Sequence, residues 1–371
     1  MKTLAAVLAA ACCAAAGATA SAPPPVAAPA WIVESGTGEV LAGRNAYERR
    51  AIASITKLMT VLVALDHRAL SDVVTVDERA AEVGQESIAL RAGERLTVRD
   101  LVRGALIQSA NDAAVALALA TSPNLTAFAN LMNAKARELG LVHSHFVRPD
   151  GLDAPGEYST AADVTKLARE AMDVPIIRQT VAESTAAIAG GRVLHTWNDL
   201  LGVVPGVIGV KTGHTGEAGW SQVAADRRGA VLVYATILGS RTREQRNADL
   251  RRLLAWGLGQ FSVVDAITRG RSYAEVELPY GRGSLAAVAA GGLRTVVPPG
   301  RVLTQRIVAP RVAGLPVFRG QVLGRVDVYL GPRLVGSRPL VASRTVPVPG
   351  LGSRVRWYAT RTVKDIAGLL T

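Results

Sequence analysis

The chain has 371 residues, of which 49% are hydrophobic and 19% charged. This is too long for one typical domain and too apolar for a disordered chain, so two packed domains are the first expectation. The formal net charge of +12 would suit a nucleic acid, an anionic membrane surface or an anionic substrate. The basic residues are spread without a dense run, and the export signal described next argues against a nucleic-acid partner.

The first twenty residues have the three parts of a secretory signal peptide. Lys2 gives a positive start, residues 4–16 are apolar, and Ala18-Thr19-Ala20 is a small-x-small cleavage site. Cleavage would remove both cysteines, Cys12 and Cys13, and with them any thiol chemistry. Lipoprotein processing at Cys12 is a weaker alternative, because no Leu or Val precedes it by three residues. We expect export across the cytoplasmic membrane to the periplasm or cell envelope.

The mature chain then changes character twice. Residues 21–30 are rich in Pro and Ala and predict a linker. Residues 31–262 mix the helical and strand periods expected of a domain with an antiparallel sheet flanked by helices. Strands are predicted at 31–33, 39–42, 207–210, 221–225 and 230–238. Helices are predicted at 53–65, 97–119 with a break near 108–111, 124–139 and 244–256.

Beyond residue 262 the pattern changes to short Val/Leu runs separated by Gly, Pro and Arg. This spacing predicts a small all-β domain over residues 268–350. Residues 353–371 predict a helix with apolar residues towards one side and basic residues towards the other. Such a helix is too short to span a bilayer. It could lie on an anionic membrane surface or dock on the β domain, and the sequence leaves both alternatives open.

Three short motifs occur in order: Ser54-Ile55-Thr56-Lys57, Ser109-Ala110-Asn111 and Lys211-Thr212-Gly213. Either of the first two patterns alone is expected on the order of once by chance in a chain this long. Their combination is that of serine acyl-transfer enzymes, the penicillin-binding proteins and class A β-lactamases.

The first motif places a hydroxyl and an amine one helical turn apart. Ser54 lies near a predicted helix start, where the helix dipole favours a developing negative charge. Lys57 can act as its base only if burial or a second cation, for which Lys211 is the candidate, lowers its pKa. A capping serine and a surface lysine are the alternative reading of this motif alone.

The other two motifs would complete a cleft. Ser109 and Asn111 lie at the predicted helix break, where they can relay a proton and hold a substrate backbone; capping and turn roles are the commoner alternative. Lys211 and Thr212 can bind a carboxylate, although strict strand alternation would send them to opposite faces. The N–H groups of His214 and Ser54 could form an oxyanion hole.

The chain resembles the type 5 D-alanyl-D-alanine carboxypeptidase family of low-molecular-mass penicillin-binding proteins. Beyond the three motifs, the resemblance rests on residues 109–114 (SANDAA), 145–152 (HFVRPDGL), 158–161 (YSTA) and 210–215 (VKTGHT). Arg148 stands where the family has Asn. Arg246, in the stretch before Trp256, falls at the family's substrate-carboxylate arginine, and Arg243 is a weaker candidate.

The resemblance implies a serine β-lactamase/transpeptidase-like α/β (α+β) catalytic domain and a small all-β C-terminal domain. It implies removal of the terminal D-Ala from peptidoglycan stem peptides through an acyl-enzyme, and covalent binding of β-lactams. The implied catalytic residues are Ser54, Lys57 and Ser109. The implied substrate-binding residues are Asn111, Lys211, Thr212, His214 and Arg246. No cofactor or metal is implied.

Other interpretations fit the sequence less well. His143, His145 and Asp150 are too few ligands for a metal site. Glu157 is placed wrongly for the deacylating base of a β-lactamase. A D,D-endopeptidase and a non-catalytic cell-wall binding protein remain as alternative functions.

Overall fold

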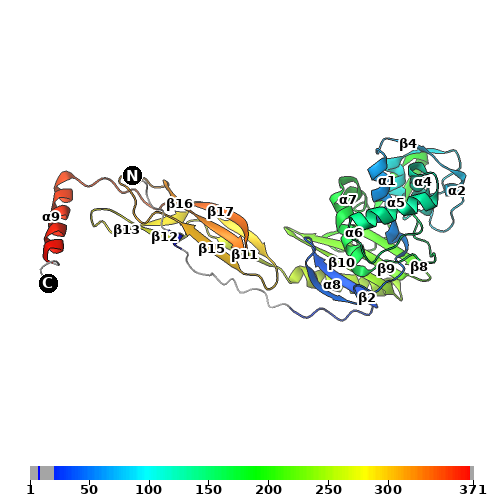
Figure 1. Ribbon diagram of the computed structural model, residues 1–371, viewed down its shortest axis with the longest axis horizontal. Coiled ribbons are helices and arrows are strands. Elements are labelled where there is room, and N and C mark those ends of the chain that lie inside the picture. The colour runs from blue at the N-terminus through cyan, green and yellow to red at the C-terminus, as the bar shows by residue number, and fades with distance from the viewer. Residues whose placement is uncertain (1–6, 9–20, 368–371) are drawn as a thin grey trace. The chain divides into compact units, whose positions relative to one another are not determined.

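The computed structural model describes residues 7–8 and 21–367 (Figure 1). Most of the predicted signal peptide, with Cys12 and Cys13, and the last four residues lie outside the described residues. The described chain divides into two compact units, residues 22–259 and the part from residue 260 onward, with which the two-residue strand β1 (Val7–Leu8) pairs. The end of the catalytic domain that the sequence analysis places at residue 262 lies close to this division.

A five-stranded antiparallel sheet forms the centre of the first unit, in the order β3-β2-β10-β9-β8. Every strand predicted between residues 31 and 238 is present, and β8 extends further than expected, through the third motif. The strands are β2 (Ala30–Ser35), β3 (Val40–Arg44), β8 (Val207–Thr215), β9 (Gly219–Arg228) and β10 (Val231–Ser240).

Helices cover both faces of this sheet (Figure 1). Thr165 of α6 hydrogen-bonds Thr236 of β10, whereas Gly257 of α8 packs against Val233 of the same strand. Since side chains alternate along a strand, α6 and α8 lie on opposite faces. The helices are α1 (Lys57–His67), α2 (Glu78–Ala81), α3 (Val98–Leu106), α4 (Asn111–Thr121), α5 (Leu125–Glu138), α6 (Ala161–Asp173), α7 (Pro175–Thr180) and α8 (Arg243–Gly259).

Short elements complete the first unit. They are the 3₁₀ turns η1 (Ala53–Thr56) and η2 (Ala189–Gly191) and the hairpins β4 (Val73–Thr75) with β5 (Arg95–Thr97) and β6 (Thr185–Ile188) with β7 (Arg192–His195). Helix α4 is the centre of the helical layer, because its run of small residues Ala113–Ala116 is fully enclosed. Among the described helices none is long and apolar enough to cross a membrane alone; α4 and α5, bent by 89°, meet the length and composition test only as a pair.

The Pro/Ala segment before β2 does not behave as a free linker. It forms no helix, as expected, but Val26 and Ala28 are buried against the first unit. The Arg44 guanidinium donates to both of their carbonyl oxygens, and the Ala27 N–H donates to Asp249 at 3.1 Å. The apolar residues at every second position allow an extended chain to pack one side inward, which composition alone did not reveal.

The second unit is the predicted small β domain with its own core, and its main sheet has the order β1-β15-β16-β17-β13-β12. The strands are β11 (Ser262–Ile267), β12 (Ser272–Glu277), β13 (Ser284–Ala289), β14 (Leu293–Val297), β15 (Leu303–Val308), β16 (Val322–Leu330) and β17 (Arg333–Ala342). Strands β11 and β14 form a separate pair. Val326 and Val328 of β16 are fully buried in this core. Asp327 between them is also buried, and it accepts hydrogen bonds from Arg325 and Ser337.

The predicted C-terminal helix is α9, Leu351–Ala367. Its first turns contact the β12–β13 loop, where the rings of Trp357 and Tyr358 lie edge-on to Tyr280 at centroid distances of 5.6 and 6.1 Å. Leu351 and Val355 are nevertheless 78% and 66% exposed. Part of the helix therefore docks on its own unit while an apolar side remains in solvent.

Candidate active site

Ser54 is presented by the 3₁₀ turn η1, immediately before α1. The regular α-helix therefore begins at Lys57, one turn later than the predicted start at residue 53. Ala53 adopts φ of 50°, a conformation uncommon for a residue with a side chain. The three-residue spacing places the Lys57 Nζ 2.6 Å from Ser54 Oγ, so the first motif is assembled as a hydrogen-bonded pair.

The Lys57 amine is completely buried and held by three acceptors. Besides Ser54 Oγ, Nζ donates to Asn111 Oδ1 at 2.7 Å and to the Asp150 carbonyl at 2.8 Å. Burial lowers the pKa of Lys57 to about 7, although nearby carboxylates act in the opposite direction. Of the two causes that the sequence suggested, burial and a second cation, burial is the larger.

Ser109 and Asn111 lie at the break between α3 and α4, as predicted. Ser109 has φ of 65° and is turned towards β8, where it accepts a hydrogen bond from Lys211 Nζ at 2.8 Å. Asn111 is the first residue of α4. Its side chain accepts from Lys57 and donates to the Gly84 carbonyl at 3.0 Å. The break therefore places the Ser109 and Asn111 side chains within hydrogen-bonding distance of the two motif lysines, Lys211 and Lys57.

The third motif lies inside β8, next to η1. Lys211 is buried and donates to Ser109 Oγ and to the Thr212 carbonyl at 2.9 Å. Burial, and then the Lys57 ammonium, hold the pKa of Lys211 well below its usual range. A Cβ on Gly213 would approach the Ile52 carbonyl oxygen to 2.6 Å, so only glycine permits this strand to lie against the nucleophile's turn.

A cavity of about 230 Å³ opens in front of this cluster. The residues that line it include five that the sequence singled out: Ser54, Ser109, Thr212, His214 and Arg246. The other three, Lys57, Asn111 and Lys211, are buried and do not line the cavity; Lys57 donates to Ser54 and to Asn111, and Lys211 donates to Ser109. All eight predicted site residues are thus brought together, in two layers.

Arg246 of α8 supplies a buried cation at the cavity. It is 1% exposed, and its guanidinium donates to Asp199 at 3.0 Å and to Asn247 Oδ1. Burial lowers the pKa of Arg246 to about 10, so it stays charged at neutral pH. Arg243 shares the Asp199 carboxylate but is stacked on Trp197 at 5.2 Å, outside the cavity lining. The geometry favours Arg246 of the two candidates.

Several contributors were not found from the sequence. Gln85, Glu86, Trp197 and Trp220 line the cavity, and Trp220 stacks on His214 at a centroid distance of 4.0 Å. The sequence contains only five tryptophans, and this scarcity was the one signal that could have marked Trp197 and Trp220 as candidate site residues. Asp112 is buried and accepts from the Ile88 and Leu90 N–H groups and from Ser87 Oγ. It thereby anchors the loop that carries Glu86.

The two histidines weighed for metal binding have other contacts. His145 Nδ1 is 2.8 Å from the Gly156 carbonyl oxygen, and its ring stacks on Tyr158. Asp150 is ion-paired with Arg148 at 2.7 Å. Within residues 7–8 and 21–367, no group of three or more His, Cys, Asp or Glu side chains could hold a metal ion.

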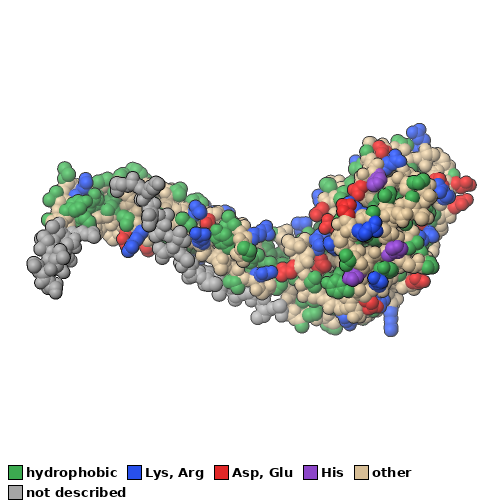
Figure 2. All heavy atoms as spheres, in the orientation of Figure 1, with side chains coloured by type: hydrophobic (Ala, Val, Ile, Leu, Met, Phe, Trp, Pro, Cys, Tyr) green, Lys and Arg blue, Asp and Glu red, His purple; other side chains and the backbone are tan. Residues whose placement is uncertain are grey.

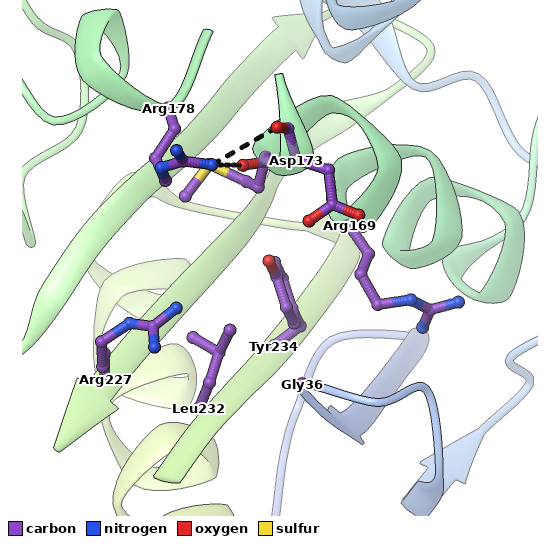
Figure 3. Close-up of a pocket in the computed structure, with 8 residues that line it drawn as sticks. Gly36, Arg169, Asp173, Arg178, Arg227, Leu232 and Tyr234 are labelled. Carbon is purple, nitrogen blue, oxygen red and sulfur yellow. Dashed lines mark hydrogen bonds between the residues drawn. The ribbon is translucent and has the colours of Figure 1, made fainter. Parts of the chain in front are cut away.

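A second cavity of about 260 Å³ lies at the hairpin end of β9 and β10, away from Ser54 (Figure 3). Arg178, Arg227, Asp173 and Tyr234 line it, and Arg178 donates to the carbonyl oxygens of Met172 and Asp173. None of the site residues predicted from the sequence lines this cavity.

Basic and acidic side chains are interspersed on the visible face of both units (Figure 2). This agrees with the absence of a dense basic run in the sequence.

Comparison with known proteins identifies the class to which this site belongs. Residues 17–242 match the family model of D-alanyl-D-alanine carboxypeptidases, peptidase family S11. The chain is 31% identical to the carboxypeptidase DacF of Bacillus subtilis, with 87% of each chain covered. It is 32% identical to DacC of Escherichia coli, covering 89% of this chain and 87% of that one.

Solved structures agree. Penicillin binding protein 6B of Escherichia coli superposes with a TM-score of 0.65 at 28% identity, over 87% of this chain and 97% of its own. Penicillin binding protein 5 of Haemophilus influenzae gives 0.64 at 27%, over 88% and 100%. The chain belongs to the S11 family of D-alanyl-D-alanine carboxypeptidases, with the penicillin-binding-protein fold and a C-terminal β domain, as the resemblance implied.

Proposed function

We propose that the protein is a serine D-alanyl-D-alanine carboxypeptidase that removes the terminal D-Ala from peptidoglycan stem peptides and is acylated by β-lactams. The observation that carries this function is the Lys57 Nζ–Ser54 Oγ hydrogen bond of 2.6 Å at the floor of the cavity. A buried amine with a pKa of about 7 can accept the serine proton at neutral pH.

In this mechanism Lys57 takes the Ser54 proton and Ser54 attacks the carbonyl of the penultimate D-Ala. The N–H groups of Ser54 and His214 stabilise the oxyanion. D-Ala departs with a proton relayed through Ser109, which Lys211 holds in place. Water then hydrolyses the ester bond and regenerates the free serine.

Recognition of a free C-terminus distinguishes a carboxypeptidase from other acyl-transfer enzymes. Thr212 and Arg246 line the cavity and are proposed to contact the terminal carboxylate. Asn111, expected to hold the substrate backbone, does not line the cavity and is proposed to orient Lys57, from which it accepts a hydrogen bond. Lys211 would act from behind by holding Ser109, since it faces Ser109 rather than the open cavity. This modifies the expectation that Lys211 touches the carboxylate directly.

Ser54→Ala tests the proposal. Covalent labelling by a fluorescent penicillin should be abolished, while the melting temperature changes little, because a hydroxyl at such a turn contributes about 1 kcal/mol or less. Labelling of the variant at the wild-type rate would contradict the assignment of Ser54. Labelling absent in the wild type too would favour the non-catalytic binding protein.

Substrate preference needs a separate measurement. Release of D-Ala from a pentapeptide should greatly exceed cleavage of a cross-linked peptide dimer, because Arg246 is a buried cation that suits a carboxylate better than an amide. Faster cleavage of the dimer would favour the endopeptidase alternative.

We further infer an exported protein that associates peripherally with a membrane through α9. Support comes from the signal-like N-terminus and from the exposed apolar residues Leu351, Val355 and Tyr358, which share one side of the helix.

A further inference from the structure

Glu157 is a carboxylate near the active site that belongs to none of the three motifs. Its Oε1 accepts a hydrogen bond from Thr56 Oγ1 at 3.0 Å, and its Oε2 accepts from the Arg148 backbone N–H at 3.1 Å. Thr56 is fully buried and immediately precedes Lys57. One side chain therefore ties the nucleophile's turn to the loop of residues 148–157.

That loop touches the catalytic pair directly. The Asp150 carbonyl accepts from Lys57 Nζ at 2.8 Å, and the Pro149 carbonyl accepts from Thr60 Oγ1 at 2.5 Å. Gly151 lies so close that a Cβ there would be 2.2 Å from the Ala53 carbonyl oxygen. Because backbone and side chain interlock here, a shift of the loop would move an acceptor that orients Lys57.

The charges around Glu157 make its ionisation relevant to the base. Lys57 faces it from α1, and Arg148 and Asp150 face it from the loop. Burial raises the pKa of Glu157 to about 7, with a further contribution from Asp150. The carboxylates that oppose the lowering of the Lys57 pKa are Asp150, Glu86, Asp112 and Glu157, and Lys211 is the cation facing Lys57 from β8.

We propose that Glu157 is a positioning residue for acylation: it orients the Ser54–Lys57 turn through Thr56, and its negative charge raises the pH at which Lys57 becomes a neutral base. This rests on the proposed function, in which Lys57 takes the serine proton. Glu157 is not a cavity-lining residue, and both its oxygens are engaged, so the role is distinct from activation of a hydrolytic water.

The test is the pH dependence of acylation by a fluorescent penicillin, measured on the full chain. Glu157→Gln is isosteric and neutral; its oxygen can accept from Arg148 N–H while its amide donates to Thr56 Oγ1. Removing a negative charge near Lys57 should favour the neutral amine. Because Glu157 carries its charge only above its pKa of about 7, the variant should acylate about two- to tenfold faster than the wild type between pH 7 and 8 and at nearly the same rate at pH 6.

Two more variants separate charge from position. Glu157→Ala loses both hydrogen bonds and should lower the plateau rate at high pH by about tenfold, whereas Glu157→Gln should restore most of it. Glu138→Gln makes the same chemical change at an exposed carboxylate of α5, and its pH profile should match the wild type.

A Glu157→Gln profile that superimposes on the wild-type profile overturns the proposal. If this variant does not fold, the wild-type profile decides, because Glu157 and Lys57 titrating together should broaden the limb beyond one ionisation. A single-ionisation limb would then contradict the proposal. Absence of wild-type acylation would instead contradict the proposed function itself.

Discussion

The Lys57 Nζ atom is the centre of the hydrogen-bond network in the site. Its Nζ holds Ser54, Asn111 and the Asp150 carbonyl within 2.8 Å, without an ion pair of its own to a carboxylate. Burial therefore lowers its pKa into the neutral range while hydrogen bonds fix its direction. Lysine suits this position because an ammonium loses its proton at accessible pH, whereas a guanidinium does not.

This arrangement predicts a pH profile. Below the Lys57 pKa of about 7 the amine is charged and cannot accept a proton, so acylation should fall steadily on the acid side and level off above. Lys57→Arg should be nearly as slow as Lys57→Ala at every pH. Penicillin acylation rates across the neutral range provide the measurement, with Lys135→Arg, a surface substitution on α5, as the control. Near-normal acylation by Lys57→Arg would show that residue 57 acts only as a fixed charge.

For single residues, the sequence predicted which side chains form the site but not how they are arranged. Ser54 and Lys57 are close in the chain, so helical spacing sufficed to pair them. Lys211 and Ser109 are 102 residues apart, and their hydrogen bond depends on β8 lying beside the α3–α4 break. Glu157 contacts Thr56 across 101 residues, and no local pattern identifies such a contact.

Among the elements, the α3–α4 break depends on a support outside the motifs. Asp112, in the first turn of α4, collects hydrogen bonds from the loop that carries Gln85 and Glu86 to the cavity. In the same loop, the Glu86 carbonyl oxygen accepts a hydrogen bond from the Asn111 backbone N–H at 2.7 Å. The acidic residue after Ser109-Ala110-Asn111 is therefore explained by loop anchoring rather than by contact with substrate.

Asp112→Ala should destabilise the protein by about 2–4 kcal/mol, because the buried Ile88 and Leu90 N–H groups would lose their acceptor and each such loss costs roughly 1–3 kcal/mol. Urea unfolding followed by circular dichroism gives the free energy of unfolding. Asp66→Ala, which removes an exposed surface ion pair with Lys135, should cost less than about 1 kcal/mol. Equal effects of the two substitutions would contradict the anchoring role.

The predicted strands and helices were found because their periods are regular, and the misjudged segments are those where packing overrides composition. Residues 22–29 contain the prolines of a linker, yet Val26 and Ala28 are buried. The first turn of the predicted 53–65 helix is 3₁₀, where β8 lies close against Ile52 and Ala53. Both departures result from tertiary contacts that a window of sequence does not contain.

For the whole molecule, the division into two units places the candidate active site and helix α9 in different units. The predicted site residues all lie in residues 22–259, and the second unit has a separate core and carries α9. Helix α9 has Arg354, Arg356, Arg361 and Lys364 against a single acidic residue, Asp365. Its partial docking through Trp357 and Tyr358 on Tyr280 shows that docking and an exposed apolar side coexist.

Removal of residues 351–371 should therefore lower cosedimentation with anionic vesicles sharply without changing penicillin labelling. Each basic residue near such a surface contributes about 1 kcal/mol, and this attraction is screened by salt, so binding of the full chain should weaken as salt rises. Neutral vesicles are the control for insertion of Leu351 and Val355 alone, and should bind the full chain weakly. Val355→Asp, at an exposed position, should reduce binding while leaving the Tyr280 contacts intact. Equal binding by the truncated and full-length proteins would mean that α9 serves only to dock on the β domain.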